Sequence, residues 1–256
     1  MTKETLFKVL TENFDAKNPN TYYISHQAFE NEDIIIRMVG FDQNNPHHCF
    51  DLWDHSMNCV KWLLVESPLY NNRNLIIASF LHDIGKPNVV QVKNDRNVFY
   101  GHAAVSAVLV KNLLIKWEFN KSDIDEICFY IAHHDDFINY KNKSEIENSK
   151  PSAKKYFTEI NCDNIYEYFM DVCHGNIVYF ERLANLCIAD ANSQADIAIV
   201  GKNKITKLEK VKKIHDIINT LHYITKNPVN FKNEMCEMEY MIKHYGGVYP
   251  SHPHTF

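Results

Sequence analysis

The sequence predicts an all-α fold, on two observations of composition and one of periodicity. Only 7 glycines and 8 prolines occur among the 256 residues, fewer than turn-rich β folds use. Hydrophobic residues make up 45% and charged residues 23% of the chain, as in ordinary globular proteins. From Asp51 onward, apolar residues recur at offsets that bring them to one face of a helix. We therefore expect a helical bundle with additional C-terminal helices.

The charge, the N-terminus and the cysteines exclude several classes of protein. A formal net charge of −5 produces no strong field for nucleic acids. The N-terminal MTKETLFKVL has no basic segment leading into an apolar one, and no window reaches the ~18 apolar residues of a membrane span. The seven cysteines include no CxxC pair, so we interpret most of them as reduced core residues. We expect a cytoplasmic protein without a membrane partner.

The first strongly periodic helix is expected over residues 51–66, DLWDHSMNCVKWLLVE. Its apolar face carries Leu52, His55, Cys59, Trp62 and Leu63. Because these residues recur near whole helical turns, His55 points inward together with its apolar neighbours.

The next helix, NLIIASFLHDIG over residues 74–85, combines a buried apolar run with a histidine and an aspartate. Gly85 and Pro87 are the expected stop signal, which puts His82 and Asp83 on the last turn. A buried aspartate without a partner is costly, so this pair requires compensation. A metal ion is one such compensation.

Two further helices are expected after a polar connection over residues 90–102. The first begins at or near His102, and the second follows a Ser122 cap with Asp125 at capping-box spacing. On this second helix, helical phase turns His134 toward the core better than His133. Asp135 and Asp136 either orient a histidine ligand or end the helix.

The C-terminal half contains a polar segment and more helices. Residues 139–155 are rich in lysine and asparagine and are expected to form an exposed loop or insertion. The helix expected over residues 177–200 places Asp190 on an apolar stripe. One or two further helices are expected over residues 205–224 and 233–246. A set of lysines in this region is interpreted as a solvated helix surface, and it comprises Lys204, Lys207, Lys210, Lys212 and Lys213.

Six polar side chains are thus expected to face the core. They are His55, His82, Asp83, His102, His134 and Asp190. A single buried histidine is usually a satisfied core residue, but six such groups would need many separate partners, whereas one metal centre satisfies them all. Imidazole and carboxylate ligands suit Mn, Fe, Co, Ni or Zn better than Mg, although Mg stays possible.

This order of residues, H…HD…H…H…D, resembles the HD-domain phosphohydrolase superfamily. His55 matches the first histidine, His82 and Asp83 the signature pair, and Asp190 the closing aspartate, which implies one metal ion. His102 and His134 match the additional histidines of dinuclear members, in which Asp83 would bridge two ions. The resemblance implies an all-α HD-domain bundle.

A closer resemblance is to the HD domain of bacterial CCA-adding enzymes and related poly(A) polymerases. It rests on VGFDQNNPHHCFDLWDHS, HDIGKP and FYGHAAVSA, and with the closing aspartate it covers about residues 38 to 195. No G-S-x-x-D-x-D-like stretch precedes it, so a nucleotidyltransferase module and CCA addition are not expected. We expect an N-terminal helical extension over 1–37, the HD domain with its insertion over 38–200, and a C-terminal helical appendage over 201–256.

Residues around the ligands complete the expected site. Lys86 follows Asp83 by three residues and is expected either to compensate phosphate charge as a flexible cation or to favour the end of the helix. Gln43, Asn44 and His48 either line the substrate pocket or form the turn in DQNNPHH. Asp83 and Lys86 are thus the candidate catalytic residues.

The expected activity is metal-dependent hydrolysis of a small phosphomonoester or phosphodiester, on a nucleotide or an RNA end. A bound ion would lower the pKa of water and polarise a phosphoryl oxygen. The resemblance implies a 2′,3′-cyclic phosphodiesterase, a nucleotidase or a phosphatase. Two alternatives use the same ligands, namely an HD-fold di-iron oxygenase and a catalytically silent metal-binding regulatory module.

Overall fold

The computed structural model describes residues 1–69, 71–137, 162–200 and 203–226, and it confirms the all-α expectation. The expected insertion at 139–155 and the expected helix at 233–246 lie outside the described residues. The chain divides into two compact units. Unit 1 contains Met1–Asn139 and Val178–Ile214, and unit 2 contains Tyr140–Ile177 and His215–Phe256.

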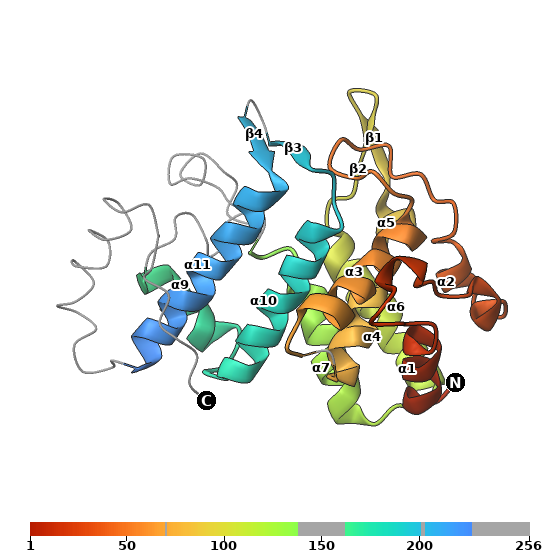
Figure 1. Ribbon diagram of the computed structural model, residues 1–256, viewed down its shortest axis with the longest axis horizontal. Helices are drawn as coiled ribbons and strands as arrows, with labels where there is room; N and C mark the ends of the chain where they lie inside the picture. The colour runs from red at the N-terminus through yellow and green to blue at the C-terminus, as the bar shows by residue number, and fades with distance from the viewer. Residues whose placement is uncertain (70, 138–161, 201–202, 227–256) are drawn as a thin grey trace. The chain divides into compact units, whose positions relative to one another are not determined.

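Unit 1 opens with short elements and then builds a bundle of longer helices. The short ones are α1 (Lys3–Thr11), the 3₁₀ turns η1 (Pro19–Thr21) and η2 (His26–Phe29), and α2 (Asp33–Ile36). The bundle consists of α3 (Leu52–Glu66), α4 (Arg73–Leu81), α5 (Lys86–Val89), α6 (His102–Lys116), α7 (Lys121–His133) and α10 (Ile177–Asn192). Figure 1 shows α3, α4, α6 and α7 gathered side by side.

Helix α4 is the centre of this bundle. Every residue from Asn74 to Leu81 is buried, because the helix is apolar on all sides. It packs against α1, α3 and α7. The side chain of Asn72 caps its N-terminus by accepting a hydrogen bond from the backbone N–H of Leu75.

The turn after α4 differs from the expected glycine stop signal. Helix α4 ends at Leu81, and Pro87 stands near the start of α5 rather than behind a helix. Gly85 has φ of −81°, so a left-handed cap is not its role. A Cβ on Gly85 would lie 2.6 Å from the backbone nitrogen of Ser106. Glycine is therefore needed because the turn that carries Asp83 packs closely against α6.

The described residues also include two small antiparallel hairpins that the sequence did not predict. Strand β1 (Gln91–Lys93) pairs with β2 (Arg96–Val98), and β3 (Ile197–Val200) pairs with β4 (Asn203–Thr206). The first occupies the expected polar connection, and positive φ angles at Asn94 and Asp95 suit a tight hairpin turn.

Two further sequence-based expectations for helix limits were wrong. The helix expected over 177–200 ends at Asn192, because the β-branched run that follows forms β3. The cap of α7 is Asn120 instead of Ser122, and its side chain accepts from the backbone N–H of Asp123. A long helix α11 (Lys207–Lys226) spans the end of unit 1 and the last described part of unit 2.

Unit 2 is described only in part. It contributes α9 (Cys162–Asp171) and the last residues of α11. Buried side chains from it include Ile165, Tyr168 and Leu221.

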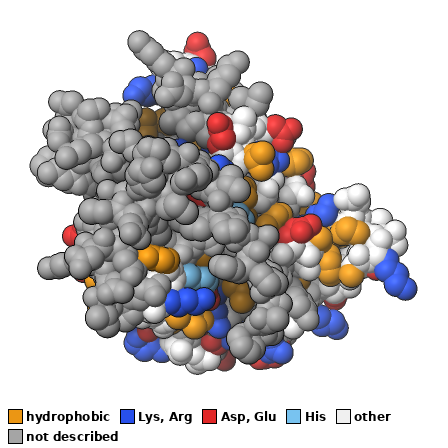
Figure 2. Space-filling model, turned by 60° about the vertical axis from the view of Figure 1, so that its left-hand side comes forward, with side chains coloured by type: hydrophobic (Ala, Val, Ile, Leu, Met, Phe, Trp, Pro, Cys, Tyr) orange, Lys and Arg blue, Asp and Glu red, His pale blue; other side chains and the backbone are white. Residues whose placement is uncertain are grey.

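Two properties of the described residues concern possible partners. None of the described helices has the length and apolar character needed to cross a membrane. On the face shown in Figure 2, basic and acidic side chains of the described residues are interspersed rather than gathered by sign.

Candidate metal centre

Four histidines from separate parts of unit 1 are anchored in the same way. Each Nδ1 lies within hydrogen-bonding distance of a backbone carbonyl oxygen: His55 with Ser193 (3.0 Å), His82 with Ser79 (2.8 Å), His102 with Phe99 (2.9 Å) and His134 with Ile131 (2.7 Å). A carbonyl only accepts, so Nδ1 carries the proton and a neutral ring leaves Nε2 with a free lone pair. The backbone thus sets which nitrogen can bind a metal ion.

The free nitrogens face one another in two pairs. Nε2 of His55 lies 3.3 Å from Nε2 of His82, and Nε2 of His102 lies 3.1 Å from Nε2 of His134. Two lone pairs at this distance repel each other unless a proton or a cation lies between them. Two nitrogens bound at about 2.1 Å and at right angles to one metal ion would be about 3 Å apart, close to both separations.

Asp83 connects the two histidine pairs. Its Oδ2 lies 3.4 Å from Nε2 of His55 and 3.3 Å from Nε2 of His82. Its Oδ1 lies 3.0 Å from Nε2 of His102 and 3.5 Å from Nε2 of His134. Each carboxylate oxygen therefore faces a different pair of imidazoles.

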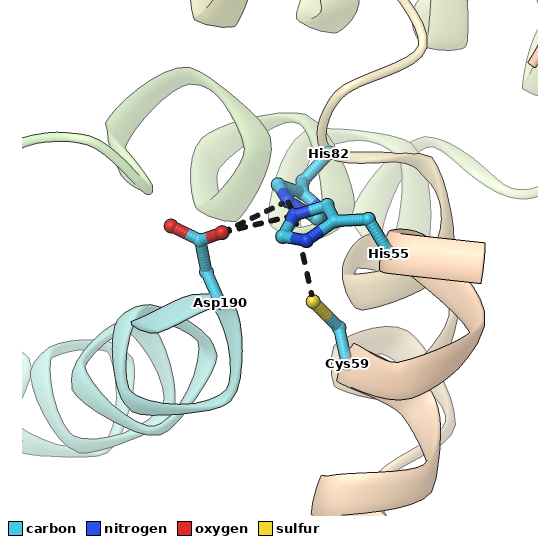
Figure 3. Close-up of side chains that lie close together, drawn as sticks. All are labelled: His55, Cys59, His82 and Asp190. Atoms are coloured by element: carbon cyan, nitrogen blue, oxygen red, sulfur yellow. Dashed lines mark hydrogen bonds and ion pairs between the residues drawn. The ribbon is translucent and has the colours of Figure 1, made fainter. Parts of the chain in front are cut away.

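Asp190 belongs to the first of these pairs. Its Oδ1 lies 3.0 Å from Nε2 of His55 and 3.7 Å from Nε2 of His82. Figure 3 shows this oxygen directed at the two rings, while the other oxygen points away from them. The sequence-predicted ligands therefore lie together, and we call them the histidine–aspartate cluster: His55, His82, Asp83, His102, His134 and Asp190.

The cluster has the properties that a divalent cation requires. Oδ1 of Asp83 and Oδ1 of Asp190 are buried and accept no hydrogen bond among the described residues. Buried carboxylate oxygens are costly unless they are paired. Together with the free imidazole nitrogens, they form a mixed N and O donor set that suits divalent transition metals. The residues present thus fit one or two such ions.

The pKa shifts of the cluster residues also indicate a cation site. Burial by itself lowers the pKa of His82, but Asp83 and Asp190 raise it to about 10. Burial by itself raises the pKa of Asp83, but Lys86 and the histidines hold it well below its usual range. The cluster therefore favours ionised carboxylates and attracts positive charge, which a metal ion can supply.

Lys86 differs from the flexible cation expected from the sequence. It is buried, and its Nζ lies 2.6 Å from Oδ2 of Asp83, 2.8 Å from Oε1 of Gln43 and 3.3 Å from Nε2 of His48. These three acceptors match the three N–H donors of an ammonium group. Lys86 therefore compensates the charge of Asp83 directly.

The loop before α3 supports this lysine and also lines a pocket. Gln43 is buried, and its Nε2 donates to the backbone oxygen of Phe50. Asn44 has a positive φ, and its backbone oxygen accepts from the N–H of Asn97 on β2. The turn-forming alternative therefore describes Asn44 well.

The pocket has a volume of about 520 Å³, and the loop between Gly40 and Asp51 forms most of its lining. Its lining includes Asn44, His48, Phe50 and Arg96. The ring of His48 also packs edge to face against His55, with centroids 5.2 Å apart. His48 thus connects the pocket with the histidine–aspartate cluster.

The choice between the adjacent histidines follows helical phase. His134 is buried and lies in the cluster, whereas Nδ1 of His133 pairs with Asp136 at 2.7 Å. From the sequence, Asp135 was expected either to orient a histidine ligand or to end the helix. In the structure, its Oδ2 lies 3.5 Å from Nε2 of His102. His102, His134 and Asp135 together offer donor atoms close enough to hold one ion.

Cys59 is a neighbour of the cluster that the sequence analysis treated only as a core residue. Its Sγ lies 3.9 Å from Nε2 of His55, one helical turn away on α3 (Figure 3). The i, i+4 spacing of His55 and Cys59 on one helix could have predicted this contact from the sequence.

Comparisons with known proteins agree with this geometry. Residues 52–174 match the family model of the HD domain, and Asp190 lies beyond this range. The CC-adding tRNA nucleotidyltransferase of Thermus thermophilus is 29% identical over 115 residues. This similarity covers 43% of the chain and only 25% of that relative. The HD superfamily is one of metal-dependent phosphohydrolases. Residues 52–174, just under half of the chain, are therefore similar to the HD family.

Proposed function

We propose that this protein is a metal-dependent phosphohydrolase that acts on a phosphomonoester or phosphodiester of a nucleotide or an RNA end. The observation that carries the proposal is the carboxylate of Asp83, with one oxygen toward each pair of Nε2 atoms. Two groups of ligands that share one carboxylate suit a dinuclear centre. The choice of substrate class is supported by the similarity to a relative whose name states that it acts on tRNA.

The cluster would hold the first ion through His55, His82, Asp190 and Asp83, and a second through His102, His134 and Asp83. Such ions lower the pKa of water and polarise a phosphoryl oxygen. The Nδ1 contacts with the backbone hold the imidazoles in one tautomer and orientation. Lys86 keeps Asp83 ionised and would act with it as the predicted catalytic pair.

The activity test measures phosphate release and ring opening. The substrates are nucleoside 2′-, 3′- and 5′-monophosphates and 2′,3′-cyclic nucleotides, each with Mn²⁺, Co²⁺, Ni²⁺ or Mg²⁺. We expect metal-dependent turnover that falls about 10³-fold in Asp83→Ala, because several kcal/mol of transition-state stabilisation depend on the bound ions.

The adjacent histidines supply a matched control. His134→Ala should lose turnover nearly as Asp83→Ala does, whereas His133→Ala should keep most of it, since His133 pairs with Asp136 outside the cluster. Full activity in Asp83→Ala would contradict the proposed site. Absence of turnover with every metal, together with bound iron and substrate-dependent oxygen uptake, would favour the oxygenase alternative.

A further inference from the structure

Asp190 has two carboxylate oxygens in different surroundings. Oδ1 faces His55 and His82 and accepts no hydrogen bond among the described residues. Oδ2 accepts a hydrogen bond from Nε2 of Gln194, at 3.0 Å. The second contact leaves Oδ1 for the histidine pair, so Gln194 determines which way the carboxylate is turned.

Gln194 is in turn held by a lysine from a distant part of the sequence. Nζ of Lys210, on the first turn of α11, donates to Oε1 of Gln194 at 2.5 Å. An ammonium group only donates and a carboxylate only accepts, so the amide can satisfy both neighbours in just one orientation. Its oxygen must face Lys210 and its NH₂ group must face Asp190.

The hydrogen-bonded side chains of Lys210, Gln194 and Asp190 lie in the interior of unit 1. Gln194 is 7% exposed and Lys210 is 8% exposed. This burial corrects the interpretation of Lys210 as part of a solvated lysine surface. A lysine is rarely buried unless it is paired, and within the described part of the chain Nζ of Lys210 donates to the amide oxygen of Gln194.

The start of α11 is fixed beside Gln194 by separate contacts. The backbone N–H of Lys207 donates to the backbone oxygen of Asp196 at 2.9 Å, and the side chains of the two residues form an ion pair at 3.0 Å. The backbone N–H of Ala195 donates to the oxygen of His47. The two backbone contacts place Gln194 beside Lys210 without involving the cluster, and the ion pair to the exposed Asp196 adds little to them.

We infer that Gln194 and Lys210 are positioning residues that preset Oδ1 of Asp190 for a metal ion at His55 and His82. The inference rests on the metal centre proposed above. It extends that centre to α11, because a lysine beyond the family-model match completes the support of one ligand. Such supporting contacts typically change metal affinity by about tenfold or more when they are removed.

The test measures the affinity for Co²⁺ by competition with a chelator, and the visible absorption of the bound Co²⁺. Gln194→Leu and Lys210→Met each remove one contact while keeping a side chain of similar length. We expect about a tenfold loss of affinity in each. The double variant should lose little more Co²⁺ affinity than the weaker-binding single variant, because either substitution interrupts the same series of hydrogen bonds. The absorption band should change as well, because the carboxylate is no longer held in one orientation.

Lys207→Met is the matched control, because it makes the same substitution on the same turn and breaks only the ion pair with the exposed Asp196. It should bind Co²⁺ as the wild type does. Circular dichroism without metal checks that the variants fold, and the two single variants test the chain independently. Unchanged Co²⁺ affinity in folded variants would overturn this inference alone. A wild-type chain that binds no Co²⁺ would overturn the metal centre as well.

Discussion

The histidine–aspartate cluster and a second group of polar side chains both gather inside unit 1 from separate helices. The second group is centred on Glu126 and Asp123 of α7 and includes Lys3, Asn74, Tyr130 and Arg182. We call it the Glu126 network. Both groups place two carboxylates close to the core, but they differ in how the charge is compensated.

In the Glu126 network the protein satisfies its own carboxylates. Oε1 of Glu126 accepts from Tyr130 and Arg182, and Oε2 accepts from Asn74. Oδ1 of Asp123 accepts from Lys3 and from Asn74. The carboxylate oxygens of this network are thus satisfied without any ligand, although Oδ1 of Asn74 and Nε of Arg182 are buried without a hydrogen bond among the described residues. The network joins α1, α4, α7 and α10.

In the histidine–aspartate cluster one oxygen of each carboxylate accepts no hydrogen bond among the described residues, and imidazole nitrogens face each other. A cluster of this kind needs a cation, whereas the Glu126 network does not. The comparison therefore separates the proposed metal site from a structural network by their unsatisfied carboxylate oxygens. Burial and residue type alone would not separate them.

The largest effect on stability is expected from Lys86→Met. Lys86 is the lysine that contacts Asp83, and removal of one partner from a buried ion pair costs about 3–5 kcal/mol. The free energy of unfolding of the metal-free protein, measured with urea, should fall by about this amount. Added Mn²⁺ should restore part of the loss, because a cation again compensates Asp83. Metal content should stay unchanged and turnover should slow.

The control for this prediction is Lys116→Met. Lys116 is exposed and pairs with Glu32 at 2.8 Å, so its loss should cost about 1 kcal/mol or less. If both variants lost the same small amount, Asp83 would not depend on Lys86 for its charge, and the cluster would resemble the Glu126 network more closely than we argue.

Metal addition should distinguish the two groups directly. At a free metal concentration of about 100 times Kd, binding to the native state stabilises it by about 2.7 kcal/mol. We expect this gain in the wild type and in Glu126→Gln, although Glu126→Gln weakens hydrogen bonds to a charged group and starts about 1.5–3 kcal/mol lower. Asp83→Ala should show no gain. Thermal unfolding with and without chelator measures the gain in stability for each protein. An equal gain in Asp83→Ala would place the metal elsewhere.

The sequence predicted the helices that carry the cluster because their apolar residues follow one period. His55 shares a face with Leu52 and Cys59, and His134 shares one with Ile127 and Ile131, so both were expected to point inward. The structure brings both side chains into the cluster. Their role as metal ligands stays a prediction, as do the roles of the other cluster residues.

The supporting contacts could not be predicted, because they depend on tertiary packing between segments that are distant in the sequence. Gln194 and Lys210 are 16 residues apart, and the β3–β4 hairpin, which the sequence did not predict, lies between them. Lys86 was expected to be a flexible cation or a lysine that favours the helix end, because the turn around Gly85 was interpreted as the end of a helix. Its burial depends on Gln43 and His48, nearly forty residues or more away.

The smallest effect expected concerns the pH dependence of the Glu126 network. Burial by itself raises the pKa of Asp123, but hydrogen bonds from Lys3 and Asn74 outweigh it and lower the pKa below its usual range. The contribution is therefore complete above the unfolded-state pKa, about 3.9, and is lost as the pH falls through the lower folded-state pKa.

Lys3→Met should reduce the free energy of unfolding at pH 7 by about 1 kcal/mol or less. The difference between variant and wild type should shrink as Asp123 becomes protonated below about pH 4. Urea unfolding with chelator present measures this difference without a metal contribution. Lys121→Met, which breaks the exposed pair with Asp125, should show almost no difference at either pH. A difference for Lys3→Met that stayed constant from pH 7 to pH 3 would mean that Lys3 stabilises the fold by packing. The charge of Asp123 would then depend on the hydrogen bonds from Asn74 and Asn120.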